Sequence, residues 1–337
     1  MISVIICSRN RAQSLERTLM TVAEMDVPGH IEWEMLLIDN GSVDETAAVV
    51  ASFQDRIPIR RVVEPKLGLS NARNRGIQEA AGDYICWTDD DVLIERSWLS
   101  AYAHSFHANP GASFFGGPIQ PVLEGRTPLW FEENRHSLAN LLAERDLGDA
   151  AIQLSQSGDR LPYGANFAVR VQEQRRHPYD PDLGVAPHQR RLGEETAMLL
   201  EIVREGGAGI YVPGARVRHI ISEARQTLSY VGIYQQSIGE TWAYLSRNGQ
   251  ENFMGASVSD KRTKLLGVPV WMLMRASAHQ VFYVLLHKRA DSPIWMKHWL
   301  KYNYYRGAIR HWSNAANNND HVAVPQRIEF GLSGRTS

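Results

Sequence analysis

The chain has 337 residues, 44% of them hydrophobic, so it is long and apolar enough for one large folded domain with an appendage. Its formal net charge of -1 gives no general attraction for polyanions, so we expect no nucleic acid partner and only local sites for phosphate. Cys7 and Cys86 both lie in apolar runs. Buried free thiols favour a reducing compartment, which predicts a cytoplasmic protein.

The hydrophobic segments argue against secretion and against a membrane span. The apolar run Ile2–Ile6 opens the chain without a basic segment or a cleavage site, so we expect no signal peptide. The best candidate for a span, Leu265–Leu286, is interrupted by Arg275, His279 and Gln280, which are costly in hydrocarbon. A peripheral position on the inner face of the membrane stays open.

The first third of the chain alternates between two hydrophobic periods. Short β-branched runs are typical of buried strands, and apolar residues three and four apart are typical of helices. The predicted strands are Ile2–Cys7, Trp33–Ile38, Ile57–Val63, Asp83–Trp87 and Ala112–Phe115, and the predicted helices are Arg11–Met25, Glu45–Phe53 after an N-cap at Asp44, Ser70–Ala80 and Ile94–His107. Alternation with short connections predicts an α/β fold, a mostly parallel sheet flanked by helices.

The regular alternation is lost after residue 115. Two short strands, Phe167–Val169 and Ile210–Val212, flank a helix that begins near Glu194, and the pattern is helical from Leu228 to about His311. We therefore expect a globular domain over residues 1–225 with halves 1–115 and 116–225, a helical C-terminal region over 226–315, and a flexible tail over 316–337.

Polar clusters follow three of the predicted strands. They are Ser8–Arg11, Asp39–Ser42 and Thr88–Asp91. The carboxyl ends of parallel strands meet at one edge of a sheet, which is where such sheets bind ligands. Asp39 there could accept hydrogen bonds from a nucleobase or a ribose, or could simply form a turn with Asn40 and Gly41.

Three consecutive aspartates, Asp89, Asp90 and Asp91, end the fourth strand of this sheet. Three unpaired carboxylates repel one another, and a divalent cation such as Mg²⁺ or Mn²⁺ relieves that repulsion. An isolated acidic triplet is as often a solvated turn before a helix. The position at the ligand edge favours the metal.

Two helix starts carry charged groups. Leu67–Gly76 begins a helix whose N–H groups favour anions, and Arg73 and Arg75 could clamp phosphates or merely solubilise the surface. Glu194 and Glu195 open a later helix. They either cap it or supply a general base, and the residues alone do not rank the two. His219 ends a strand-like run and is either structural or a metal ligand.

These motifs, in this order, resemble family 2 of the glycosyltransferases with the GT-A fold over roughly residues 1–225. Asp39–Asp44 is similar to the family's Asp-Asn-Gly-Ser-x-Asp element, Thr88–Asp91 to its DxD region and Gly193–Glu195 to its Gly-Glu-Asp element. The resemblance implies an inverting transfer from a UDP- or GDP-sugar to a saccharide, lipid-linked or other hydroxyl acceptor, with a divalent metal. It implies a nucleotide-binding half at 1–115 and an acceptor half at 116–225.

The resemblance also implies site residues, one by one. Glu195 is the implied base, although the change from Asp to Glu leaves Glu194 open. The nucleotide or donor set is Ser8, Arg9, Arg11, Asp39, Asn71, Arg73, Asp89 and Asp90, the acceptor or sugar set is Gly164 and Asn166, and the metal set is Asp91 and His219.

Other interpretations stay open. A sugar-phosphate nucleotidyltransferase would carry a Gly-rich loop after the first strand, and Ser8–Arg11 contains no glycine. A non-catalytic nucleotide- or sugar-binding module would not need Glu195. In Val281–Trp312 aromatic residues alternate with cations, a pattern that suits either a membrane surface or a helical cap or homodimer contact.

Overall fold

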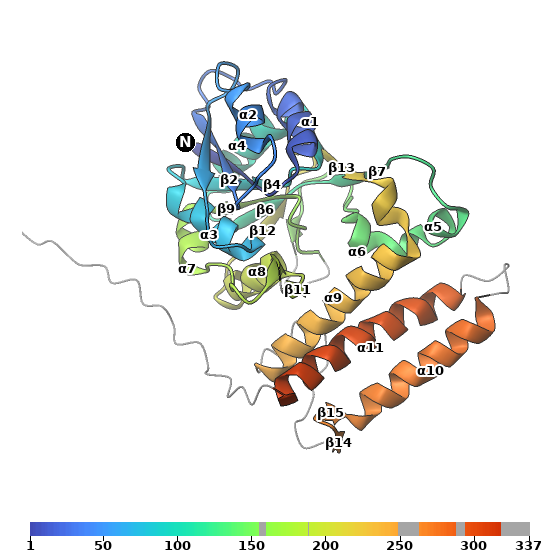
Figure 1. Cartoon of the computed structure of the whole chain (residues 1–337). Coiled ribbons are helices and arrows are strands. Elements are labelled where there is room, and N and C mark those ends of the chain that lie inside the picture. Colours follow the sequence, from blue (N-terminus) through green and yellow to red (C-terminus); the bar gives the residue numbers. More distant parts are fainter. Residues whose placement is uncertain (155–159, 188, 249–262, 288–293, 318–337) are drawn as a thin grey trace, which may run out of the picture.

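The computed structural model describes residues 1–154, 160–187, 189–248, 263–287 and 294–317. An α/β domain occupies the first two thirds of the chain, and three long C-terminal helices extend away from it (Figure 1). Residues 318–337, which make up most of the predicted tail, lie outside the described residues.

The domain is built on an eight-stranded sheet in the order β3-β2-β1-β4-β9-β6-β12-β8. Six strands run parallel to one another, while β9 and β8 run the other way. Their bounds are β1 (Ile2–Ser8), β2 (Trp33–Asp39), β3 (Ile59–Val63), β4 (Tyr84–Thr88), β6 (Phe114–Gly116), β8 (Gln153–Leu154), β9 (Asn166–Arg170) and β12 (Gly209–Tyr211). The predicted mostly parallel sheet is confirmed.

A smaller sheet in the order β5-β13-β7 and two short hairpins complete the strands. In the smaller sheet β13 pairs with β7 in parallel and with β5 antiparallel. The bounds are β5 (Val92–Ile94), β7 (Ile119–Leu123) and β13 (Val217–Ile221), with the hairpins β10 (Gly184–Ala186) to β11 (Gln189–Arg191) and β14 (Lys264–Leu265) to β15 (Val268–Pro269).

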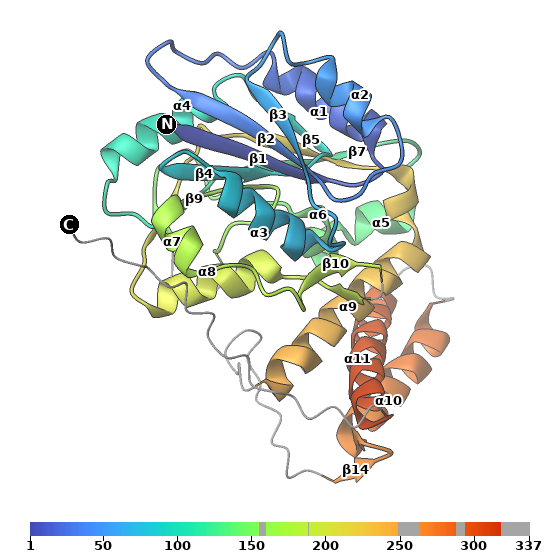
Figure 2. The same cartoon turned by 60° about the vertical axis from the view of Figure 1, so that its left-hand side comes forward.

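Helices cover both faces of the large sheet because its central strands are apolar on both sides (Figure 2). Val4 and Ile6 of β1 join a core with α1, α2 and α4, whereas Ile5 faces a second core with α3, α7 and α8. The bounds are α1 (Ala12–Val22), α2 (Thr46–Ala51), α3 (Leu69–Glu79), α4 (Trp98–Ala108), α5 (Leu129–Glu133), α6 (Ala139–Leu142), α7 (Val171–Arg176) and α8 (Glu194–Arg204), with short 3₁₀ turns η1 (Arg135–Leu138) and η2 (Glu223–Gln226).

Two local features bring the helix starts to the ligand edge. Gly76 lets α3 lie close to the sheet, because a Cβ there would stand 3.0 Å from Ile5 Cγ2. Asp44 accepts a hydrogen bond from the backbone N–H of Thr46 with one carboxyl oxygen and from that of Ala12 with the other, so it ties the start of α2 to the start of α1.

The predicted helix Ile94–His107 begins too early, because Ile94 belongs to β5 (Val92–Ile94) and the helix α4 begins at Trp98.

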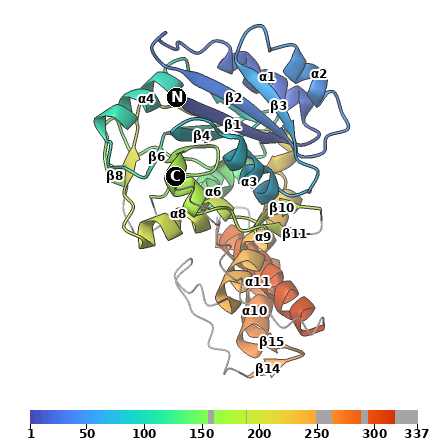
Figure 3. The ribbon, with the colours of Figure 1, turned by 90° about the vertical axis from the view of Figure 1, so that its left-hand side faces the viewer.

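The C-terminal region consists of α9 (Leu228–Arg247), α10 (Val270–Leu286) and α11 (Ile294–Asn317). Helices α9 and α11 cross closely at two glycines, since a Cβ on Gly239 would collide with Tyr304 O and one on Gly307 with Gln236 O. Helix α10 packs along α11 (Figure 3). In the described part of the chain, no helix combines the length and the hydropathy that crossing a membrane requires.

Candidate active site

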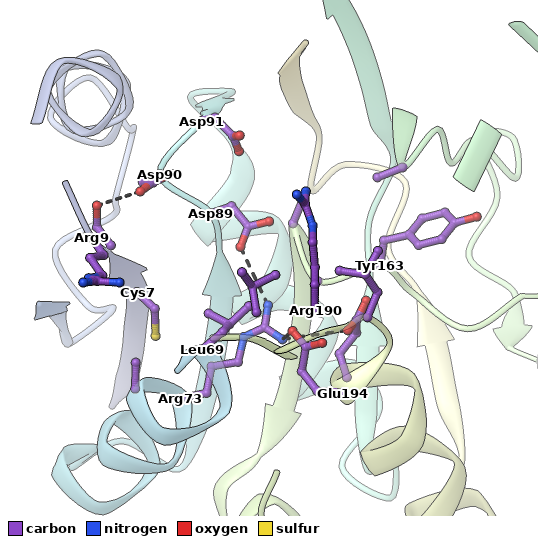
Figure 4. Close-up of a pocket in the computed structure, with 18 of the residues that line it drawn as sticks. Cys7, Arg9, Leu69, Arg73, Asp89, Asp90, Asp91, Tyr163, Arg190 and Glu194 are labelled. Atoms are coloured by element: carbon purple, nitrogen blue, oxygen red, sulfur yellow. Dashed lines mark hydrogen bonds and ion pairs between the residues drawn. The ribbon is translucent and has the colours of Figure 1, made fainter. Parts of the chain in front are cut away.

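A pocket of about 650 Å³ opens at the carboxyl edge of the large sheet. It lies among the ends of β1 and β4, the starts of α3 and α8, the β10–β11 hairpin and the first turn of α9 (Figure 4). Its size is within the usual range for a small-molecule site. We call its two walls the aspartate side, made of Asp89–Asp91 and their partners, and the tyrosine side, made of Tyr163, Tyr230, Tyr234 and Arg190.

Asp90 is held by groups that follow β1. Ser8 Oγ donates to Asp90 Oδ2 at 2.6 Å, and Arg11 Nε lies 2.9 Å from Asp90 Oδ1. Burial raises the pKa of Asp90 to about 7, against the attraction of Arg11 and with the repulsion of Asp91. The predicted residues Ser8, Arg11 and Asp90 therefore meet at one wall of the pocket.

Asp91 is the most strongly paired of the three aspartates. Its Oδ2 accepts hydrogen bonds from Arg11 Nη2 at 2.9 Å and from Arg225 Nη1 at 3.0 Å, and its Oδ1 lies 3.6 Å from His219 Nε2. Burial alone would raise the pKa of Asp91, but the attraction of the neighbouring His219, Arg225 and Arg11 side chains brings it below its usual value. Asp91 is therefore ionised in the folded protein.

The neighbourhood of Asp91 and His219 fits a divalent cation. His219 Nδ1 lies 3.0 Å from Leu142 O, and because a carbonyl only accepts, Nδ1 carries a proton there. Nε2 lies 3.2 Å from Arg225 Nη1, which also donates to Asp91, so a bound cation would take the place of this guanidinium contact. A ready cage of three His, Cys, Asp or Glu side chains is absent from the described residues. Mg²⁺ commonly takes one or two protein ligands and fills its shell with phosphate oxygens and water, so two ligands suffice.

Arg73, on α3, connects the aspartate side to the start of α8. Its Nη1 donates to Glu194 Oε1 at 2.8 Å and lies 3.9 Å from Glu195 Oε2, while its Nη2 lies 3.8 Å from Asp89 Oδ1. The Arg73 and Glu194 side chains are each 5% exposed, and Glu195 is 15% exposed. Burial and the repulsion of Glu195 raise the pKa of Glu194 to about 7, despite Arg73.

The tyrosine side contains residues that the sequence did not reveal. Tyr163 donates to Asn140 Oδ1 and Tyr234 to Asn140 O, each at 2.8 Å. Arg190 on β11 reaches into the pocket between the aspartates and Tyr163 (Figure 4), and its Nη2 lies 3.4 Å from the Tyr230 hydroxyl. These residues lie in irregular segments, on the short strand β11 and in the first turns of α9, and no sequence motif predicted a role for them.

Gly164 and Arg9 also line the pocket. A Cβ on Gly164 would stand 2.8 Å from Arg73 Nη2, so this glycine makes room for that guanidinium. Cys7 lines the pocket as well, and burial, partly offset by Arg73, raises the pKa of its thiol to about 12. Both cysteines are free thiols.

Three predicted site residues support the fold, and their side chains are not among those lining the pocket. Asn166 is fully buried, accepts from Trp98 Nε1 and Tyr102 and donates to two backbone carbonyls, so its amide is occupied within the core. Asp39, also fully buried, accepts from Arg61 and from Ser42 N. Asn71 donates to Leu67 O within its own helix start. A buried amide whose donors and acceptor are all bonded has no group left for a sugar, which corrects the expectation for Asn166.

Comparison of the sequence with known proteins gives a family match over part of the chain. Residues 3–150 match the model of glycosyl transferase family 2. Validoxylamine A glucosyltransferase from Streptomyces hygroscopicus subsp. jinggangensis is 34% identical over 112 residues, which are 33% of this chain and 26% of that protein. Succinoglycan biosynthesis protein ExoM from Rhizobium meliloti is 23% identical over 245 residues, which are 71% and 73% of the two chains. The chain thus spans about a quarter of the first relative's length.

Solved structures share the fold. A mannosyltransferase from Pyrobaculum calidifontis in complex with GDP-Man and Mn²⁺ matches with a TM-score of 0.59 and 16% identity over 92% of this chain and 86% of that chain. S. aureus TarS 1-349 in complex with UDP-GlcNAc matches with a TM-score of 0.52 and 13% identity over 96% and 93%. These similarities confirm the GT-A fold that the motifs implied.

Proposed function

Because residues 3–150 match the model of glycosyl transferase family 2, we propose that the protein transfers a sugar, with inversion, from a UDP- or GDP-sugar to an acceptor hydroxyl. The acceptor would be a saccharide or lipid-linked molecule of polysaccharide or glycoconjugate biosynthesis. Residues 1–225 would form the catalytic domain, with the nucleotide bound by 1–115 and the acceptor by 116–225. The observation that carries the proposal is one pocket lined by Asp91, His219, Arg73 and Glu195.

Glu195 is the better general base of the two glutamates. Glu194 Oε1 is taken by Arg73 at 2.8 Å, and its side chain is buried. Glu195 accepts no hydrogen bond within the described residues and stands in the electrostatic environment of Tyr163 and Tyr234. A carboxylate with free oxygens next to the acceptor wall can take the proton of an attacking hydroxyl.

On the aspartate side, fixed charges would hold the donor. Asp91 and His219 would bind Mg²⁺ or Mn²⁺, which when bound supplies positive charge to a diphosphate leaving group. Arg73 and Arg11 would add fixed positive charge beside that diphosphate. Ser8 and Asp90 would orient Arg11, and Asp89, at 38% exposure, is accessible to the donor's ribose or sugar. A mannosyltransferase of similar fold, solved in complex with GDP-Man and Mn²⁺, supports this arrangement.

A nucleotide-sugar screen tests the function. UDP- and GDP-sugars are compared by their effect on the melting temperature of the full chain with Mn²⁺, and the stabilising donor is incubated with and without mixed saccharide and lipid-linked acceptors. We expect one donor class to stabilise the protein and to release its nucleoside diphosphate with inversion at the sugar. Stabilisation by none of them, or synthesis of a sugar nucleotide from a nucleoside triphosphate and a sugar phosphate, would refute the proposal.

We also infer that α10 and α11 dock on an anionic membrane face. Together these helices contain five lysines and arginines and no acidic residue, whereas the whole chain has a formal net charge of -1. On α10 the exposed residues Met274, Val281 and Leu285 share one face, with Phe282 beside them. Arg275, Lys297 and Lys301 are exposed and surround His279 at the edge of that face. An apolar stripe bordered by bases complements anionic lipid headgroups.

The free thiols Cys7 and Cys86 favour the cytoplasmic face for this contact. Vesicle sedimentation tests it with phosphatidylcholine alone and with added phosphatidylglycerol. We expect salt-sensitive binding to the anionic vesicles only, weakened about tenfold or more by Lys297→Glu with Lys301→Glu and by Phe282→Ser. Met20→Ser, at an exposed position on α1, is the control. A dimer in solution that the α10 variants dissociate, without vesicle binding, would contradict the membrane contact.

A further inference from the structure

Arg190 is a pocket arginine that has no carboxylate partner. In the described part of the chain its neighbours are the Tyr230 hydroxyl, 3.4 Å from Nη2, and the Tyr230 ring, whose centre lies 5.4 Å from the guanidinium carbon. Its Nε is buried and donates to no partner among the described residues. The other pocket arginines near the aspartates, Arg11, Arg73 and Arg225, each pair with a carboxylate. A guanidinium is always charged, so half-buried Arg190 brings to the pocket a positive charge that is available to an anion.

Arg225 approaches the same tyrosine ring. Its guanidinium carbon lies 5.7 Å from the centre of Tyr230, and its Nε is also buried without a partner among the described residues. Arg225 reaches Asp91 with a single nitrogen, Nη1. Two guanidinium groups therefore lie near one aromatic ring and keep donors without partners, and a guanidinium can bind an oxyanion with two parallel hydrogen bonds.

This pair lines the same pocket as the proposed base Glu195. Tyr234 follows Tyr230 by one helical turn on α9. Burial raises the pKa of Tyr234, the negative charge of Glu195 adds to the rise, and the positive charge of Arg225 opposes it, so Tyr234 lies in the fields of both groups. Arg225 also contacts Asp91 at 3.0 Å, so the pair adjoins the Asp91 site, beside which Arg11 and Arg73 would hold the donor's diphosphate.

We propose that Arg190, Arg225 and Tyr230 form an anion-binding subsite for an oxyanion, a phosphate or a carboxylate, carried by the acceptor. The subsite rests on the proposed glycosyl transfer and narrows its acceptor class to anionic molecules. A neutral saccharide would leave the charge of Arg190 uncompensated inside the pocket. An oxyanion held there places a neighbouring hydroxyl on the Glu195 side of the pocket.

Inorganic phosphate is the first probe, and sodium acetate the second. The full chain is saturated with UDP or GDP and Mg²⁺, which fills the diphosphate position, and its melting temperature is followed against added phosphate at constant ionic strength in chloride. We expect a saturable rise in the wild type. Arg190→Ala should raise the half-saturating phosphate concentration about tenfold or more and leave nucleotide affinity unchanged. A larger response to phosphate identifies phosphorylated acceptors, and a larger response to acetate identifies acidic saccharides.

Arg191→Ala is the matched control, because Arg191 is the next residue of β11 and pairs with Glu240 outside the pocket. It should leave the phosphate response unchanged. The subsite is refuted if the nucleotide-loaded wild type shows no phosphate response, or if Arg190→Ala lowers nucleotide affinity as much as phosphate affinity, which would assign Arg190 to the donor. Failure of the wild type to bind any nucleoside diphosphate would instead refute the proposed function.

Discussion

The two sides of the pocket hold their charges in opposite ways. On the aspartate side each carboxylate has a guanidinium partner, with Asp90 2.9 Å from Arg11, Asp91 3.0 Å from Arg225 and Glu194 2.8 Å from Arg73. On the tyrosine side Glu195 accepts no hydrogen bond and Arg190 has no carboxylate within the described residues. The ion pairs of the first wall are short, whereas Glu195 has only a 3.9 Å approach from Arg73 and Arg190 only a 3.4 Å contact with the Tyr230 hydroxyl.

This difference separates what the fold supplies from what substrates supply. Buried charges that are paired and hydrogen-bonded keep a fixed geometry, which suits the binding of a diphosphate whose charge is the same for every donor. Glu195 and Arg190 make few contacts within the fold, so they keep an acceptor and donors for a substrate whose hydroxyl must lose a proton. Substitutions on the two sides should therefore fail in different ways, on the tyrosine side in turnover and on the aspartate side in stability or donor binding.

The largest expected effect is on turnover. Glu195→Gln should lower kcat by about 10²–10⁴-fold, because the attacking hydroxyl loses its base, while nucleotide affinity stays near that of the wild type. Transfer assays and nucleotide titrations measure the two quantities. Glu205→Gln, just after the same helix and paired with Arg176 at the surface, is the control. Wild-type turnover in Glu195→Gln would remove the distinction between the two walls.

Arg73→Ala should produce the largest loss of stability. The substitution leaves Glu194 buried without its cation, and breaking a buried pair costs about 3–5 kcal/mol. Urea denaturation measures the free energy of unfolding. Arg75→Ala is the matched control on the same helix, since its pair with Glu79 is partly exposed and worth about 0.3–0.5 kcal/mol. Equal losses in the two variants would show that the aspartate side is not held by buried pairing.

Asn166→Ala should destabilise the protein without a specific effect on either wall. Its amide is bonded to Trp98, Tyr102 and two backbone carbonyls, and each buried group left without a partner costs about 1–3 kcal/mol. Nucleotide and acceptor affinities should remain unchanged in the folded variant. A selective loss of acceptor affinity at wild-type stability would restore the role that the family motif implied.

The smallest effect is a pH dependence from Glu194. Its pKa is raised by burial and by Glu195 to about 7 in the folded protein, from an ordinary value of 4.5. A raised folded pKa stabilises the fold below the unfolded value, so the free energy of unfolding should fall as the pH rises from about 4.5 to about 7. Denaturation of Glu194→Gln between these pH values should show a flatter profile. An unchanged slope would mean that Arg73 keeps Glu194 ionised throughout.

The sequence predicted the parts of the molecule that depend on local periodicity. Short β-branched runs such as Ile2–Cys7 predict strands that are buried on both faces of a parallel sheet. The polar residues that follow these strands then meet at the carboxyl edge of the sheet. The structure accordingly brings Ser8, Asp90 and Asp91 together. The structure also brings Arg73 beside Glu194, because both lie at helix starts that face that edge.

Residues whose position depends on tertiary packing escaped prediction. Arg190 is on a three-residue strand and Arg225 in a 3₁₀ turn, elements too short to give a periodic signal. Asn166 and Asp39 fit a family motif, yet their side chains bond within the core, which only the burial of their neighbours reveals. Within the resemblance, Glu194 and Glu195 could be separated only by finding which of them Arg73 occupies.

Nucleotide titration with and without Mn²⁺ tests the central claim most directly, by calorimetry on the wild type, Asp91→Ala and Asp83→Ala. Asp83 is exposed and lies just before the other end of β4, so it serves as the control. We predict that Mn²⁺ strengthens UDP or GDP binding in the wild type and in Asp83→Ala, and that Asp91→Ala loses this metal dependence. The same strengthening by Mn²⁺ in Asp91→Ala would contradict the account.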